Sequence, residues 1–85
     1  MRLKFAIVGG DARLVFLAGL LWRDGHRVCT YALERAELPK EIPKAGCLQG
    51  CVYGADCVVL PTPAEAGGFL FAPLSAEKQI GRAHV

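Results

Sequence analysis

The chain has 85 residues, which is enough for one small domain at most. Hydrophobic residues make up 53% of it and charged residues 21%, a composition that argues against a disordered segment. The formal net charge is only +2 and the basic residues are scattered, so we expect neither a nucleic-acid nor an anionic-membrane partner. No apolar run approaches the roughly 18 residues that span a bilayer, and none forms a secretory signal. The sequence therefore predicts a cytoplasmic protein.

The first part of the chain predicts a β-α-β unit. Residues 3–8 form a short apolar run, rich in strand formers and bounded by glycines, which is typical of a fully buried parallel strand. A helix is expected to follow, capped at its start by Asp11 and running to about Arg23. Gly25 suits the left-handed residue that ends a helix. A second strand is then expected over residues 27–33.

The rest of the chain predicts one more buried strand, at residues 57–60, which Pro61 ends. Pro39 and Pro43 break any long helix in the connection that leads to it. The weaker elements are a helical turn at 34–38, a short helix within 47–54, a loop or loose hairpin over 62–73 and the start of a helix at 76–79.

This order of elements predicts an α/β, Rossmann-like fold. Parallel strands joined by right-handed crossovers give the spatial order 2-1-3. That arrangement is half of a doubly wound parallel sheet, so the fold is expected to be incomplete. Residues 1–78 are expected to form this N-terminal domain.

Residues 79–85 are expected to be foreign to the domain. They can be written back into DNA that resembles the start of a common sequencing-library adapter. The alternative is a genuine tail that happens to match. The adapter interpretation agrees with a fold that stops halfway, and it leaves His84 without a biological role.

The turn after the first strand holds the residues best suited to bind an anion. Gly9 and Gly10 form a tight turn before a helix, whose N-terminus offers unpaired N–H groups and a positive dipole end. Arg13 could supply two N–H groups to a carboxylate or phosphate. The dinucleotide fingerprint is not matched, because Asp11 stands where its second glycine belongs. In the alternative interpretation Asp11 only caps the helix, and Arg13 is solvated or pairs with it.

A second candidate site follows the third predicted strand. In doubly wound sheets, ligands bind beyond the carboxyl ends of the strands, near the point where the strand order reverses. Thr62, between Pro61 and Pro63, is expected there beside Gly9 and Gly10, where it could contact a ligand. The alternative is a rigid proline exit from a strand.

No catalytic set and no metal site is visible in the sequence. The four cysteines, at positions 29, 47, 51 and 57, lack the spacing of a zinc site, so we expect reduced, small, buried apolar side chains. His26 follows the predicted helix end and is expected at the surface. The catalytic residues are therefore not identified.

Three stretches together resemble the A subunit of dipicolinate synthase, near its N-terminus. They are residues 7–13 (IVGGDAR), residues 24–28 (DGHRV), and the run from Gly54 through Leu60 and Pro61 to residues 72–75 (APLS). The resemblance covers about residues 3–78, and its most specific part is the GGDAR turn.

The resemblance implies the N-terminal domain of an NADP-dependent oxidoreductase of sporulating bacteria. Such an enzyme converts a dihydrodipicolinate-type intermediate to dipicolinate together with a second, flavoprotein-like subunit. NADP would be bound by a second, C-terminal domain, so no residue here is assigned to the cofactor. This domain would form one wall of the interdomain cleft and be inactive alone. Gly9, Gly10, Asp11 and Arg13 match the family motif without an assigned catalytic role.

Two other interpretations stay open. One is a stand-alone nucleotide- or anion-binding module that uses the Gly9–Arg13 turn, and the other is a non-catalytic, partner-binding domain. Association into a homo-oligomer also stays open.

Overall fold

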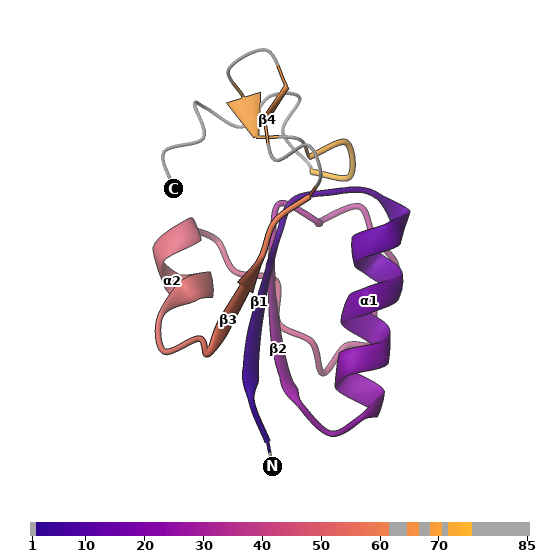
Figure 1. The fold of residues 1–85 in the computed structure, drawn as a ribbon. Helices are drawn as coiled ribbons and strands as arrows, with labels where there is room; N and C mark the ends of the chain where they lie inside the picture. The colour runs from indigo at the N-terminus through magenta and orange to yellow at the C-terminus, as the bar shows by residue number, and fades with distance from the viewer. Residues whose placement is uncertain (1, 62–64, 67–68, 71, 76–85) are drawn as a thin grey trace.

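The computed structural model describes residues 2–61, 65–66, 69–70 and 72–75 (Figure 1). Its elements in chain order are β1 (Lys4–Val8), α1 (Ala12–Arg23), β2 (Arg27–Tyr31), α2 (Leu48–Val52), β3 (Cys57–Val59), β4 (Glu65–Ala66) and β5 (Phe69–Leu70). The predicted strand, helix, strand and strand are therefore present. β4 and β5 pair in antiparallel fashion, as expected of a loose hairpin. The helix start expected at 76–79 and the tail at 79–85 lie outside the described residues.

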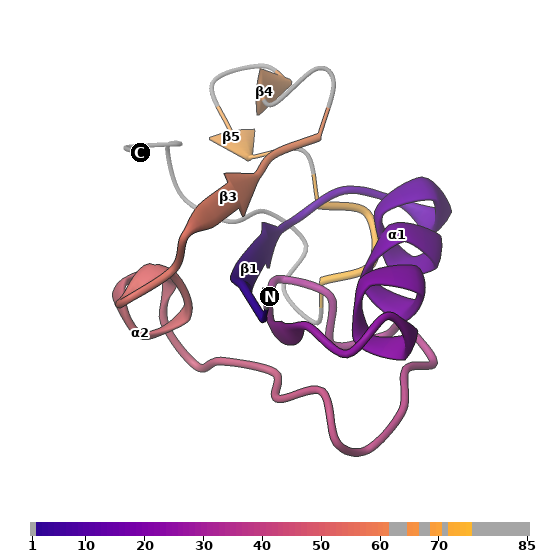
Figure 2. The same cartoon turned by 60° about the horizontal axis from the view of Figure 1, so that its bottom comes forward.

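A three-stranded sheet in the order β2-β1-β3 forms the centre of the fold, with both pairings parallel. The predicted order 2-1-3 and the Rossmann-like half-sheet are confirmed. Figures 1 and 2 show α1 on one face of this sheet and α2 on the other. Both faces of the sheet are thus covered, as parallel sheets require.

Side chains of β1 alternate between two apolar clusters, one on each face. Ala6 and Val8 pack with Cys51 of α2, whereas Ile7 packs with Ala18 of α1. All five of these residues have no exposed surface. The even-numbered and odd-numbered positions face opposite ways because successive side chains of a strand point to opposite faces.

The end of β2 differs from the prediction of a strand over residues 27–33. β2 ends at Tyr31, because Ala32 has a φ of 64°, a left-handed conformation that interrupts the extended backbone. Ala32 is itself buried. The chain therefore turns sharply inside the protein at this point rather than continuing the sheet.

β3 differs from the buried strand that the sequence predicts at residues 57–60. It covers only Cys57–Val59, and Cys57 and Val58 are exposed. β3 pairs with β1 along one edge only, so within the described sheet it is an edge strand. The apolar run at residues 57–60 predicts a strand, but an apolar run alone does not tell an edge strand of a sheet from a central strand.

The irregular connection before α2 runs along the outer edge of β2. The Thr30 N–H donates to the Pro43 carbonyl at 2.9 Å, and the Ala45 N–H donates to the Thr30 carbonyl at 2.7 Å. These two bonds form a single parallel bridge between Thr30 and Lys44. They satisfy part of an edge that would otherwise be open. In the described part of the chain, no helix is both long and apolar enough to cross a membrane.

Gly10 and Gly19 provide a matched pair of stability tests. Gly10 has a φ of +95°, and a Cβ there would lie 2.6 Å from Leu14 Cγ, whereas a Cβ at Gly19 meets nothing within 4 Å. Gly10→Ala should lower the free energy of unfolding by roughly 1–3 kcal/mol because of the left-handed backbone and the clash. Gly19→Ala, inside α1, should raise it by up to about 1 kcal/mol. Urea denaturation measures both, and equal effects would contradict the described turn.

Candidate functional site

The carboxyl ends of the strands meet at one edge of the sheet, where sequence analysis places the candidate site. Gly9 and Gly10 follow β1 with φ angles of 70° and 95°, and Ala32 follows β2. The Gly9 N–H donates to the Tyr31 carbonyl at 2.8 Å and so ties these two strand ends together. Pro61, just after β3, is buried. This edge is where open α/β sheets bind their ligands.

Asp11 and Arg13 form a local unit on the N-terminus of α1. The Asp11 carboxylate accepts from the backbone N–H of Arg13 and from Arg13 Nε, both at 3.0 Å. The Asp11 side chain thus caps the helix, as predicted, and also forms an ion pair. The Arg13 side chain is 67% exposed, and that of Asp11 is 34% exposed. The capping interpretation therefore describes Asp11, while the guanidinium stands at the surface of this edge.

The contact between Asp11 and Arg13 shifts the pKa of each side chain in the direction that favours its charged form. The side-chain hydrogen bond from Arg13, followed by the backbone bond from the same residue, lowers the pKa of Asp11 below its ordinary value of 3.8. The same side-chain hydrogen bond to Asp11 raises the pKa of Arg13. At neutral pH the unit consists of a carboxylate and a guanidinium.

This turn does not fit the pyrophosphate of a dinucleotide. The negative charge of Asp11 already occupies the helix N-terminus, where a bound phosphate would lie. Gly10 is also needed for a different reason, since the space on its Cβ side is filled by Leu14 of the helix. Gly10 therefore serves the close packing of the turn against Leu14.

The structure brings to this edge a contact that the sequence did not reveal. The Ser75 hydroxyl donates to Glu34 Oε1 at 3.2 Å, and the Arg35 N–H donates to the Leu74 carbonyl at 2.8 Å. Figure 1 shows residues 72–75 at the same end of the sheet as the glycine turn. No local pattern could have indicated this contact, because it joins segments about forty residues apart. Thr62 lies outside the described residues.

Two of the four cysteines are not buried as expected. Cys29 and Cys51 are buried, whereas Cys47 and Cys57 are exposed. Burial, followed by the nearby Cys29, raises the pKa of Cys51 to about 12, so its thiol stays protonated and poorly nucleophilic. Among the described residues, no group of three or more His, Cys, Asp or Glu side chains could hold a metal ion.

His26 is not the surface residue that we expected. It is half-buried, and its Nδ1 accepts from the Leu3 N–H at 3.1 Å. Its ring packs edge-on against Phe5, with 5.2 Å between the ring centroids. His26 therefore anchors the start of β1, at the amino end of the sheet, away from the glycine turn.

A family model that describes the N-terminal domain of the dipicolinate synthase A subunit matches residues 4–83. Searches of curated proteins and of solved structures gave no match.

The Asp11 cap predicts a specific dependence of stability on acid. Because the folded-state pKa of Asp11 is lowered, its contribution is present above the unfolded value, near 3.8, and is lost as the pH falls through the folded value. Asp11→Asn retains a capping oxygen but cannot titrate. The difference in urea midpoint between the native chain and Asp11→Asn should therefore shrink below about pH 4. A difference that stays constant down to pH 2 would contradict the Asp11–Arg13 contact.

Proposed function

Because the chain belongs to the family of N-terminal domains of the dipicolinate synthase A subunit, we propose that it forms one wall of the interdomain cleft of an NADP-dependent oxidoreductase. The reaction is the oxidation of a dihydrodipicolinate-type intermediate to dipicolinate in sporulating bacteria. It proceeds in the cytoplasm together with a second, flavoprotein-like subunit. In this proposal NADP is bound by a second, C-terminal domain, and the domain described here has no activity by itself.

The observation that carries this division of roles is the Asp11 carboxylate on the N-terminus of α1. In a doubly wound fold the first glycine turn is the usual place for a pyrophosphate. Here the carboxylate occupies that place with its own charge, and Leu14 fills the space beside Gly10. These features favour a domain that lines the cleft and contacts the substrate, and they speak against a domain that binds the cofactor.

Arg13 is the residue best placed to contact a substrate at this edge. A dihydrodipicolinate-type substrate carries two carboxylates, and a guanidinium pairs with a carboxylate through two parallel hydrogen bonds. The bond from Nε to Asp11 fixes the direction of the guanidinium, whose side chain is 67% exposed. We assign Arg13 the recognition of a substrate carboxylate and Asp11 the positioning of Arg13.

The proposal predicts that the 85-residue chain binds no NADP, because the glycine turn that follows β1 is capped by its own carboxylate. Isothermal titration calorimetry of the folded chain with NADP should give no heat of binding. Micromolar binding that is lost in Asp11→Ala and Arg13→Ala, but kept in Arg35→Ala, would contradict it. That result would instead support a stand-alone nucleotide- or anion-binding module that uses the Gly9–Arg13 turn.

A further inference from the structure

The side of α1 that faces away from the sheet carries apolar residues, where a surface helix is usually polar. Phe16 is 69% exposed and Leu20 is 40% exposed, and the two lie one turn apart on this side. Gly19 shares this side, which Ala12 and Arg23 complete at its two ends. Figure 1 shows α1 at the outside of the fold. We call these five residues the outer face of α1.

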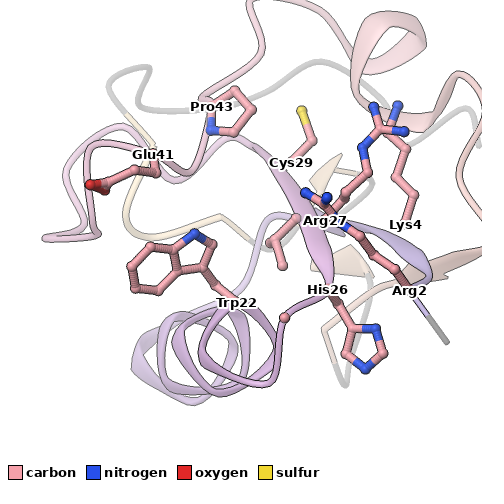
Figure 3. A pocket seen from close by; sticks show the side chains of 10 residues that line it. Arg2, Lys4, Trp22, His26, Arg27, Cys29, Glu41 and Pro43 are labelled. Carbon is pink, nitrogen blue, oxygen red and sulfur yellow. The ribbon is translucent and has the colours of Figure 1, made fainter.

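The other sides of α1 already have partners within the chain. Leu14 and Ala18 pack into the apolar cluster between the helix and the sheet. Figure 3 shows Trp22 rising from α1 toward the segment that holds Glu41 and Pro43, and these three residues line the same pocket. The helix is thus apolar around most of its circumference, a pattern that is normal for a helix covered on all sides. In the described part of the chain, its outer face is the side that has no cover.

Gly19 leaves a hole in the middle of this outer face. A glycine inside a helix is less favourable than an alanine, and a close approach by a neighbouring group is one reason to keep it there. No described group makes that approach, because a Cβ built on Gly19 meets nothing within 4 Å. When two helices pack, side chains of one fill such gaps in the surface of the other. The space over Gly19 can therefore receive a large side chain from another molecule.

The charges at the two ends of α1 favour an antiparallel neighbour of the same kind. Asp11 lies at the N-terminus, and both bonds from Arg13 go to its Oδ1. Arg23 and Asp24 lie at the other end, where both are exposed and neither forms an ion pair with a described residue. An antiparallel copy brings its Arg23 beside Asp11 and its Asp24 beside the positive end of the helix dipole. A parallel copy would bring each of these charges beside its own kind.

We infer that the outer face of α1 binds a second copy of this chain, with the two helices antiparallel and Phe16 of each copy over Gly19 of the other. This register also places Arg23 opposite Ala12, next to Asp11. Because a two-fold interface uses the same surface on both copies, each contact occurs twice. One helix from each copy buries less surface than a standard interface, so the association is weak, in the micromolar to millimolar range. The inference does not rest on the proposed function, since it involves neither substrate nor cofactor.

Sedimentation velocity of the 85-residue chain measures this association directly. The sedimentation coefficient should rise toward that of a dimer between about 10 µM and 1 mM. Phe16→Ser should lower the association constant by at least about tenfold, because it removes the aromatic ring at the centre of the interface. Tyr53→Ser removes another exposed aromatic ring, at the end of α2, and should change the constant less than about twofold. A chain that stays monomeric at 1 mM, or equal losses in the two variants, would overturn the inference.

Gly19→Ala separates an effect on folding from an effect on association. The alanine should stabilise the helix, as measured by urea denaturation at a concentration where the chain is monomeric. The same methyl group should weaken association by at least about fivefold, because it fills the space that Phe16 of the other copy occupies. A glycine without a role in pairing would give the gain in stability with an unchanged association constant, and that result would contradict the inference.

A charge reversal tests the antiparallel register. Arg23→Glu places a carboxylate beside Asp11 of the other copy, so association at low salt should weaken by at least about threefold. Arg35→Glu changes the net charge equally, at an exposed position outside the outer face, and should change association less than about twofold. Equal effects of the two reversals would contradict this register.

Discussion

The pairing of β1 on both of its edges is the interaction on which the rest of this structure depends. β1 is hydrogen-bonded to β2 through five residue partners and to β3 through three. Ala6, Ile7 and Val8 have no exposed surface, and they belong to the two apolar clusters on either face of the sheet. Because a parallel sheet aligns the equivalent ends of its strands, this pairing also decides which residues meet at each edge.

The two edges of the sheet consequently have different chemistry. At the carboxyl end the backbone turns sharply through Gly9, Gly10 and Ala32, and the Asp11–Arg13 pair stands at the surface. At the amino end β1 and β2 begin with Lys4 and Arg27, which are direct partners in the sheet register. The first edge is where we propose that a substrate meets the cleft of a two-domain enzyme.

Short-range signals in the sequence predicted the central part of the fold. The apolar run before Gly9, the capping carboxylate of Asp11 and the left-handed Gly25 each act within a few residues of their own position, so β1 and α1 were found with nearly correct bounds. The capping role of Asp11 was predicted for the same reason. The parallel order of the three strands followed from the handedness of the crossovers.

The features that the sequence could not predict depend on contacts between segments that are far apart in the chain. The bonds of Thr30 with the segment around Lys44, and the bond of Ser75 to Glu34, depend on distant segments and leave no periodic pattern. The exposure of Cys57 likewise follows from the position of β3 at the edge of the sheet, not from its composition. The pairing of Lys4 with Arg27 was missed because the two residues are far apart in the sequence and meet only through the strand register.

The central claim, that this domain contacts substrate and leaves NADP to another domain, is tested most directly by Arg13→Gln in a full-length enzyme that contains this domain. Two quantities are compared with those of the unchanged enzyme: the Kd for NADP and the KM for the dihydrodipicolinate-type substrate. The account predicts a KM raised by roughly tenfold or more, since a charge-assisted contact to a carboxylate is lost, with the Kd for NADP unchanged. A weakened Kd for NADP with an unchanged KM would contradict it, and would place the cofactor at the Gly9–Arg13 turn.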